Sequence, residues 1–272
     1  MDQTDIKRLT IEILDKSNET ISVVSGNEEV SLVYEENYQE GDKIHFTSMS
    51  ENKYLVIKID DELKESLIYL IGNTLDFLIP FDEKAKPYSE NTFKGLKHNI
   101  SMRLAKEEEV YSYRNLAENV MDQRGETSYY PHATANVETR NESVFAARNV
   151  IDGRTDTQGH GSWPYESWGT WQREDAQIRV DFGRAVEADK IALYLRADYP
   201  HDTYWNYIRV EFSDGSYKIV EPVRSCEAQY FEFDKKVITW IKLLNFKKSE
   251  EKIDFAALTE IQVYGKDNQN NL

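Results

Sequence analysis

Short apolar segments with a period of two constrain the fold of this chain more than any other feature. In residues 177–183 (QIRVDFG), Ile178, Val180 and Phe182 alternate with polar residues, which places them on one face of an extended strand. The second half of the chain repeats this pattern in residues 190–196, 207–220, 230–234, 237–244 and 260–265. Such segments, split by loops, predict an antiparallel β-sandwich or β-barrel. Trp240 lies inside one of these strands, and we expect it to be a core residue.

The first half also reads as strands, which are short, rich in β-branched and aromatic residues, and separated by turn residues. They are predicted in residues 6–14, 20–24, 30–34, 43–47, 54–59 and 100–104, with two more in 67–80 that break at Gly72 and Asn73. Residues 106–124 have a partial helical period that ends at Gly125. We therefore predict an all-β chain of two β-sandwich domains. The first is a domain of unknown role in residues 1–125, with a linker from about residue 105, and the second covers residues 126–272.

The charge of the chain restricts its partners. A net charge of −16 over 272 residues argues against nucleic acid and against an anionic membrane, because both need a basic face. The longest apolar runs, such as residues 67–72, are far too short to span a bilayer. The residues after Met1 include no apolar signal region, so we expect a cytoplasmic protein unless a leader has been removed from a secreted one.

Residues 160–171 (HGSWPYESWGTW) gather three of the five tryptophans into one short segment. A proline and two glycines in the same segment exclude a helix or a regular strand, so the segment is predicted to be a loop. Two interpretations fit: the tryptophans plug the core from a loop, or they form an aromatic binding surface.

Four motifs in register give the second half a family resemblance. They are ARNVIDGRTDT at 147–157, VDFG at 180–183, VEFSDGS at 210–216 and LTEIQVYG at 258–265. Residues 129–266 thereby resemble the coagulation-factor type C, or discoidin-like, family, which includes many bacterial carbohydrate-binding modules. The resemblance implies a galactose-binding-like jelly roll of about eight strands. The first half shows no such resemblance.

The resemblance also implies a structural calcium ion beside residues 151–153, which we call the IDG loop. Calcium takes oxygen ligands from carboxylates and from backbone carbonyls in bent loops. The matching positions are the side chains of Asp152 and Glu260, the carbonyls of Asn149, Arg154 and Thr259, and Asp156 or Thr157 to complete the shell. The alternative is that Asp152 and Gly153 only build a turn. The loop from Gly153 to Trp163 is longer than in many relatives.

The sugar site of this family lies on loops at one end of the sandwich and varies among members, so we infer it here from chemistry. Sugars stack their C–H faces on aromatic rings and hydrogen-bond planar polar groups through their hydroxyls. Two segments offer both kinds of group: His160, Trp163, Tyr165, Trp168 and Trp171, and Arg196, Asp198, Tyr199, His201, Asp202, Tyr204, Trp205 and Asn206. Each has a structural alternative, because Trp163 or Trp168 can cap the sandwich and Arg196 can pair with Asp198 or Asp202.

These observations predict a non-catalytic carbohydrate-binding protein. One alternative is a protein-interaction or assembly module that uses the tryptophan-rich loop to bind a protein partner. The other is a carbohydrate-active enzyme, with acid and base residues drawn from His132, His160, His201, Asp198, Asp202 and Glu166. Glu138, Arg140 and Glu142 can line the same sugar-binding cleft as these loops, or they can pair with each other. The sequence contains no HExxH, GxSxG, GxGxxG or P-loop pattern, which favours binding over catalysis.

Overall fold

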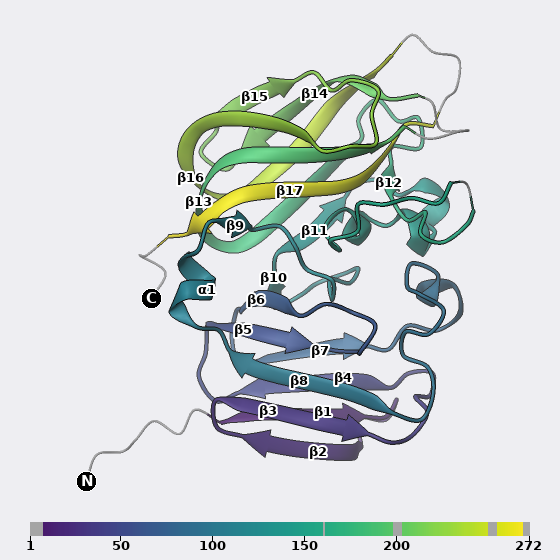
Figure 1. Ribbon diagram of the computed structural model, residues 1–272, viewed down its shortest axis with the longest axis vertical. Helices are drawn as coiled ribbons and strands as arrows, with labels where there is room; N and C mark the ends of the chain where they lie inside the picture. The colour runs from purple at the N-terminus through teal and green to yellow at the C-terminus, as the bar shows by residue number, and fades with distance from the viewer. Residues whose placement is uncertain (1–7, 160, 198–202, 250–254, 269–272) are drawn as a thin grey trace.

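The computed structural model describes residues 8–159, 161–197, 203–249 and 255–268, and it is built almost entirely of antiparallel strands (Figure 1). In the N-terminal half, one sheet has the strand order β2-β1-β4-β7 and the other the order β10-β6-β5-β8-β3. These strands are β1 (Leu9–Leu14), β2 (Thr20–Gly26), β3 (Glu29–Tyr34), β4 (Lys43–Ser48), β5 (Lys53–Lys58), β6 (Ser66–Leu70), β7 (Thr74–Leu78), β8 (His98–Leu104) and β10 (Tyr129–Tyr130). None of the described helices is long and apolar enough to cross a membrane.

Alternating side chains hold the N-terminal sandwich together, as the period of two predicted. In β4, Ile44 and Phe46 are buried while their neighbours are partly exposed. They pack in one core with residues of the facing sheet such as Leu55 and Ile100. The helical period expected after residue 105 yields only α1 (Glu107–Tyr111), a helix of five residues.

The C-terminal half is a second antiparallel sandwich, which confirms the predicted all-β fold class. Its strands are β9 (Arg114–Asn115), β11 (His132–Ala135), β12 (Trp168–Gly169), β13 (Gln177–Arg196), β14 (Trp205–Phe212), β15 (Tyr217–Val220), β16 (Gln229–Lys248) and β17 (Ala257–Asp267). The segments predicted as separate strands at 177–183 and 190–196 form one strand of 20 residues, β13. Likewise, 230–234 and 237–244 both belong to β16.

The long strand β13 serves both layers of this sandwich because it bends. Its first part, up to Asp181, pairs with β11, and its second part, from Val186, pairs with β17. Between them the register shifts, as at a β-bulge. Gly183 lies in the bend with a φ of 66°, and a Cβ there would stand 2.4 Å from the ring of Tyr130. Only glycine allows both this conformation and this approach of the two halves.

The segment between the halves contributes strands to both of them. β9 pairs with β17 of the C-terminal sheet, whereas β10, further along the chain, pairs with β6 of the N-terminal sheet. Leu116 joins the C-terminal core and Met121 the N-terminal core. The predicted boundary near Gly125 therefore falls inside a segment that both halves share.

A buried carboxylate ties the halves together. Asp267, at the end of β17, is fully buried and accepts hydrogen bonds from Tyr54 of β5 (2.8 Å), from Arg114 of β9 (2.7 Å) and from Arg184. The guanidinium of Arg184 also lies over the Tyr54 ring, 5.3 Å from its centroid. Burial raises the pKa of Asp267, but the charges and hydrogen bonds of the two arginines outweigh burial and bring the pKa below its ordinary value of 3.8.

Asp267→Asn is expected to lower the free energy of unfolding by about 3–5 kcal/mol, because it leaves the buried Arg184 without its counter-charge. A carboxylate with a lowered folded-state pKa stabilises the protein above its unfolded pKa, and this stabilisation is lost as the pH falls through the folded value. Urea unfolding between pH 3 and 7 should therefore show the difference between wild type and variant shrinking at acid pH. Asp175→Asn, which breaks an exposed pair with Arg173, is the control and should leave the midpoint unchanged. A variant as stable as wild type at pH 7 would show that Asp267 does not join the halves.

Candidate functional site

Two of the predicted site tryptophans belong to the core. Trp168 is fully buried and donates its indole N–H to the carbonyl of Val137 at 2.8 Å. Trp205 has 1% of its surface exposed, and its ring centroid lies 6.3 Å from that of Trp168 and 4.8 Å from that of Phe246. The prediction that these two residues form an exposed binding surface is wrong, because they fill the end of the sandwich beneath the loops.

Arg196 is also buried, with 1% of its surface exposed, and it holds the tryptophan-rich loop in place. Its guanidinium donates to the carbonyl of Tyr165 at 2.8 Å and to that of Gly159 at 2.9 Å. Arg196 therefore orders the loop that carries Trp163 and Trp171. Its predicted partners Asp198 and Asp202, together with His160, Tyr199 and His201, lie outside the described residues.

Trp240, which was predicted to be a core residue, differs from its prediction in the opposite direction. It is partly exposed on the outer face of β16, so its prediction as a core residue is wrong. The guanidinium of Arg179 lies 4.6 Å from its ring centroid, a cation–π contact at the protein surface. Its strand placement was predicted correctly, but the face of the strand was not.

Of the residues proposed as acids and bases, the structure describes His132 and Glu166, and both have partners within the fold. His132 is buried and its Nδ1 lies 2.6 Å from the carboxylate of Asp122. Glu166 is buried and pairs with Arg154 at 2.7 Å. Burial raises the pKa of Glu166 to about 7, and the nearby charge of Asp152 adds to this shift. Among the other predicted ligand-binding residues, Tyr165 and Tyr204 are half-buried and Asn206 is exposed.

Trp171 lines a pocket at the loop end of the sandwich, with a cavity volume of about 120 Å³. Trp171 and Phe255 are 52% and 48% exposed, which is unusual for such large aromatic side chains. We call this cavity the Trp171 pocket, and it is lined by Thr139, Arg140, Phe145, Ser167, Gly169, Thr170, Trp171, Gln172, Arg196, Phe255, Ala256 and Ala257. The sequence pattern gave no reason to select Phe255, since it precedes the last strand in a segment without a motif.

The backbone of this pocket is strained. Trp171 and Gln172 have φ values of 44° and 60°, and Arg140 and Asn141 have values of 51° and 55°. Side chains other than asparagine and aspartate rarely adopt this left-handed region, and each such residue costs about 1–3 kcal/mol. Strain of this kind gathers at ligand-binding loops, where the surrounding structure holds it in place.

Arg140 adds a fixed, planar polar group to the pocket. It forms a double hydrogen bond with Glu142, at 2.6 and 2.9 Å, and this contact lowers the pKa of that carboxyl. Its guanidinium also lies over the ring of Phe145, 5.1 Å from the centroid. The pocket thus combines exposed aromatic rings with an oriented guanidinium.

A carboxylate without a partner lies beside the IDG loop. Glu260 is fully buried, and neither of its carboxylate oxygens has a hydrogen-bond partner. Burial raises its pKa well above the ordinary value, and the charges of Asp152 and Glu118 raise it further, although the nearby backbone N–H of Gly153 and the charge of Lys64 act in the opposite direction. Burial likewise raises the pKa of Asp152 to about 6. Glu118 lies against Gly153, since a Cβ on that glycine would stand 3.0 Å from the Glu118 carboxyl carbon.

These groups fit a bound cation only in part. Across the described ranges, no three His, Cys, Asp or Glu side chains are arranged to hold a metal ion, so carbonyl oxygens must supply most of the shell. The two unpartnered oxygens of Glu260 fit such a role, since a buried carboxylate needs a counter-charge.

Several of the other predicted calcium ligands have partners of their own. The side chain of Asn149 donates to the Ser143 carbonyl at 2.9 Å, and Thr157 accepts from the backbone N–H of Gly159 at 3.3 Å. Arg154 pairs with Glu166, and Asp156 is exposed. Thr259 is buried in β17 beside Glu260. Their carbonyl ligation stays a prediction.

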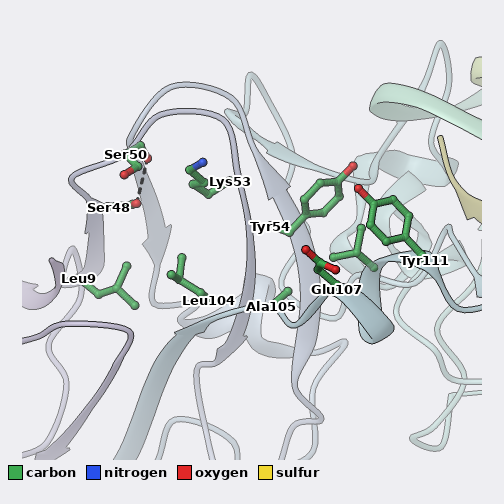
Figure 2. Close-up of a pocket in the computed structure, with 10 residues that line it drawn as sticks. Leu9, Ser48, Ser50, Lys53, Tyr54, Leu104, Ala105, Glu107 and Tyr111 are labelled. Carbon is green, nitrogen blue, oxygen red and sulfur yellow. Dashed lines mark hydrogen bonds between the residues drawn. The ribbon is translucent and has the colours of Figure 1, made fainter. Parts of the chain in front are cut away.

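A separate cavity of about 310 Å³ lies in the N-terminal half beside α1 (Figure 2). The hydroxyl of Ser48 donates to the carbonyl of Ser50 at 2.9 Å, and Tyr54 donates to Asp267. Because these polar groups already serve the fold, we assign no ligand to this cavity.

Several solved carbohydrate-binding domains are similar in structure to part of this chain. Chitosan-binding module 1, derived from a chitosanase/glucanase of Paenibacillus sp. IK-5, is 16% identical, with a TM-score of 0.40 over 56% of this chain and 98% of that chain. The family 32 carbohydrate-binding module of Clostridium perfringens NanJ, in complex with galactose, is 20% identical, with a TM-score of 0.35 over 48% and 91%. A mutant of the lectin binding domain of Lectinolysin, complexed with Lewis b, is 17% identical, with a TM-score of 0.43 over 57% and 99%. No family model and no curated protein matches the sequence.

Trp205→Ala should lower the free energy of unfolding by about 3–5 kcal/mol, because it opens a cavity beside Trp168 and Phe246. Trp240→Ala, on the outer face, should cost about 1 kcal/mol or less. Chemical unfolding of the two variants measures this difference. Equal losses in both would contradict the burial described here.

Proposed function

We propose that this chain is a carbohydrate-binding protein and that the Trp171 pocket of its C-terminal sandwich holds the saccharide. The observation that carries the proposal is the exposed pair of Trp171 and Phe255 beside the fixed guanidinium of Arg140. Aromatic faces favour the C–H groups of a sugar ring, and a planar guanidinium can donate to its hydroxyls. This combination is what a saccharide requires of a shallow site.

The strained backbone supports binding rather than a merely structural role. Left-handed residues at Arg140 and at Trp171 fix the directions of these two side chains before any ligand arrives. A site that is already ordered loses less conformational entropy on binding, so more of the contact energy appears as affinity.

The alternative of a protein-interaction module has less support from the structure. Trp168 lies in the core, and Trp163 donates its indole N–H to the carbonyl of Pro87 in the N-terminal half at 3.3 Å. The tryptophan-rich loop is thus used largely within the chain itself, and Trp171 is the most exposed of its three tryptophans.

Trp171→Ala should weaken saccharide binding at least tenfold, equivalent to about 1.4 kcal/mol, because the stacking face is lost. A glycan array followed by isothermal titration with the best binder measures the change. Trp240→Ala is the matched control, since it removes a partly exposed tryptophan on a different face. If Trp171→Ala binds as wild type does, the pocket is not the site; if wild type binds no glycan, the function itself is wrong.

We also propose that calcium binds beside the IDG loop, with Glu260 and Asp152 as side-chain ligands and Glu118 as a neighbouring carboxylate. When bound, the ion would supply positive charge to carboxylates that burial otherwise disfavours. The carbonyls of Asn149, Arg154 and Thr259, with Asp156 or Thr157, remain the proposed further ligands. The support is the pair of buried Glu260 oxygens without partners.

Calcium at about 100 times its dissociation constant should stabilise the wild-type chain by about 2.7 kcal/mol relative to EDTA. Glu260→Gln keeps the shape of the side chain but removes its charge, so it should abolish this response while the EDTA-treated variant stays folded. Thermal unfolding with calcium, with EDTA and with magnesium makes the measurement. The same melting temperature for wild type in calcium and in EDTA would overturn the site.

A further inference from the structure

A further hollow, distinct from the Trp171 pocket and from the cavity beside α1, lies between the two halves of the chain and has a volume of about 750 Å³. One wall is the N-terminal segment around residues 82–94, and the other consists of Arg154 and Trp163 from the C-terminal loops. We call it the interhalf cleft, and Glu62, Asp82, Ala85, Lys86, Tyr88, Ser89, Glu90, Asn91, Thr92 and Lys94 complete its lining.

Trp163 is held rigidly at this cleft but keeps an open surface. Its indole N–H donates to Pro87 across the junction, and the guanidinium of Arg154 lies 4.4 Å from its ring centroid. Arg154 is itself fixed by Glu166 at 2.7 Å. The Trp163 side chain nevertheless remains 38% exposed. A large aromatic ring that is fixed yet open is a stacking surface for a ligand.

The opposite wall is strained in the same way as the Trp171 pocket. Asp82 and Phe93 have φ values of 49° and 60°. A left-handed phenylalanine is a true outlier, and here it is held by the hydrogen bond from its N–H to Asp60 at 3.0 Å and by its packing on Phe77 and Tyr88. Apart from asparagines, the described non-glycine residues with positive φ all line or adjoin the two hollows: Asp82, Phe93, Arg140, Trp171 and Gln172.

The charges of the cleft indicate the class of ligand. Glu62, Asp82 and Glu90 share the lining with Lys86, Lys94 and Arg154, so carboxylates and cations balance in a chain that is strongly acidic as a whole. Within the described part of the chain, no ion pair engages Lys86, Lys94 or Glu90, so their polar groups face solvent. A neutral polyol both donates to carboxylates and accepts from cations, whereas an ionic ligand would meet like charges in this lining.

We propose that the interhalf cleft is a second saccharide site, built jointly by both halves, that takes a neutral oligosaccharide stacked on Trp163. The inference rests on the proposed function, since it extends saccharide binding to a new place. It gives the N-terminal half a direct role in recognition, because most of the lining residues come from that half.

The test uses the full chain and titrates it with lactose, triacetylchitotriose and maltotriose, neutral sugars that differ in ring and linkage. Asn91→Ala with Lys94→Ala removes polar groups from the exposed N-terminal wall, and Trp163→Ala removes the stacking surface. Trp171→Ala tests the other pocket. Calorimetry gives stoichiometry and affinity, and tryptophan fluorescence reports contact with an indole ring.

We expect two sites per wild-type chain for at least one of these sugars. The Asn91→Ala, Lys94→Ala variant should lose one of them, with at least tenfold weaker binding there, and Trp171→Ala should lose the other.

A single binding site in the wild type that is lost in Trp171→Ala and intact in the cleft variants would overturn the cleft site and leave the proposed function standing. One site lost only in the cleft variants supports the cleft and overturns the Trp171 pocket. No binding of any sugar overturns both. Melting temperatures show whether the Trp163→Ala variant remains folded, and the polar variant decides the outcome if it does not.

Discussion

The buried carboxylate of Asp267 is the contact on which the arrangement of the two halves depends. It stands at the end of the last strand and gathers Tyr54 from one sandwich with Arg114 and Arg184 from the other. Such a group is stable only when it is fully paired, so it favours one relative orientation and penalises others. The interhalf cleft exists because this orientation brings the segment around residue 88 against Trp163.

Backbone strain is concentrated at the two proposed binding sites rather than in the strands that form the cores. Apart from Gly183 in β13 and Asn245 in β16, the described strands of both sandwiches contain no residue with a positive φ, and the bulky residues in the left-handed region line or adjoin the Trp171 pocket and the interhalf cleft. The cores supply the free energy that holds these residues in place. Natural proteins commonly give up some stability where a binding surface has to be ordered in advance.

The sequence predicted strands well and exposure poorly, for one physical reason. Alternation is a local property, so β4 and β8 could be placed within a residue or two. Whether a ring is buried depends on what the rest of the fold brings against it, so Trp205 was taken as exposed and Trp240 as buried, the reverse of the structure. The bend that joins two predicted strands into β13 interrupts the alternation, so the sequence did not predict one continuous strand. Phe255 lies in a segment without a motif, so no sequence pattern predicted its place at the site.

The exchange of β9 and β10 across the junction has a consequence for how such a chain can evolve. A binding module that moves between genes as a cassette has to keep all its hydrogen-bonded edges within one continuous stretch. Here a cut at Gly125 would strip β9 from the edge of β17 and β10 from the edge of β6. Both fragments would expose unpaired strand edges, which invite aggregation. The two halves therefore have to stay joined for both of these strand edges to remain paired.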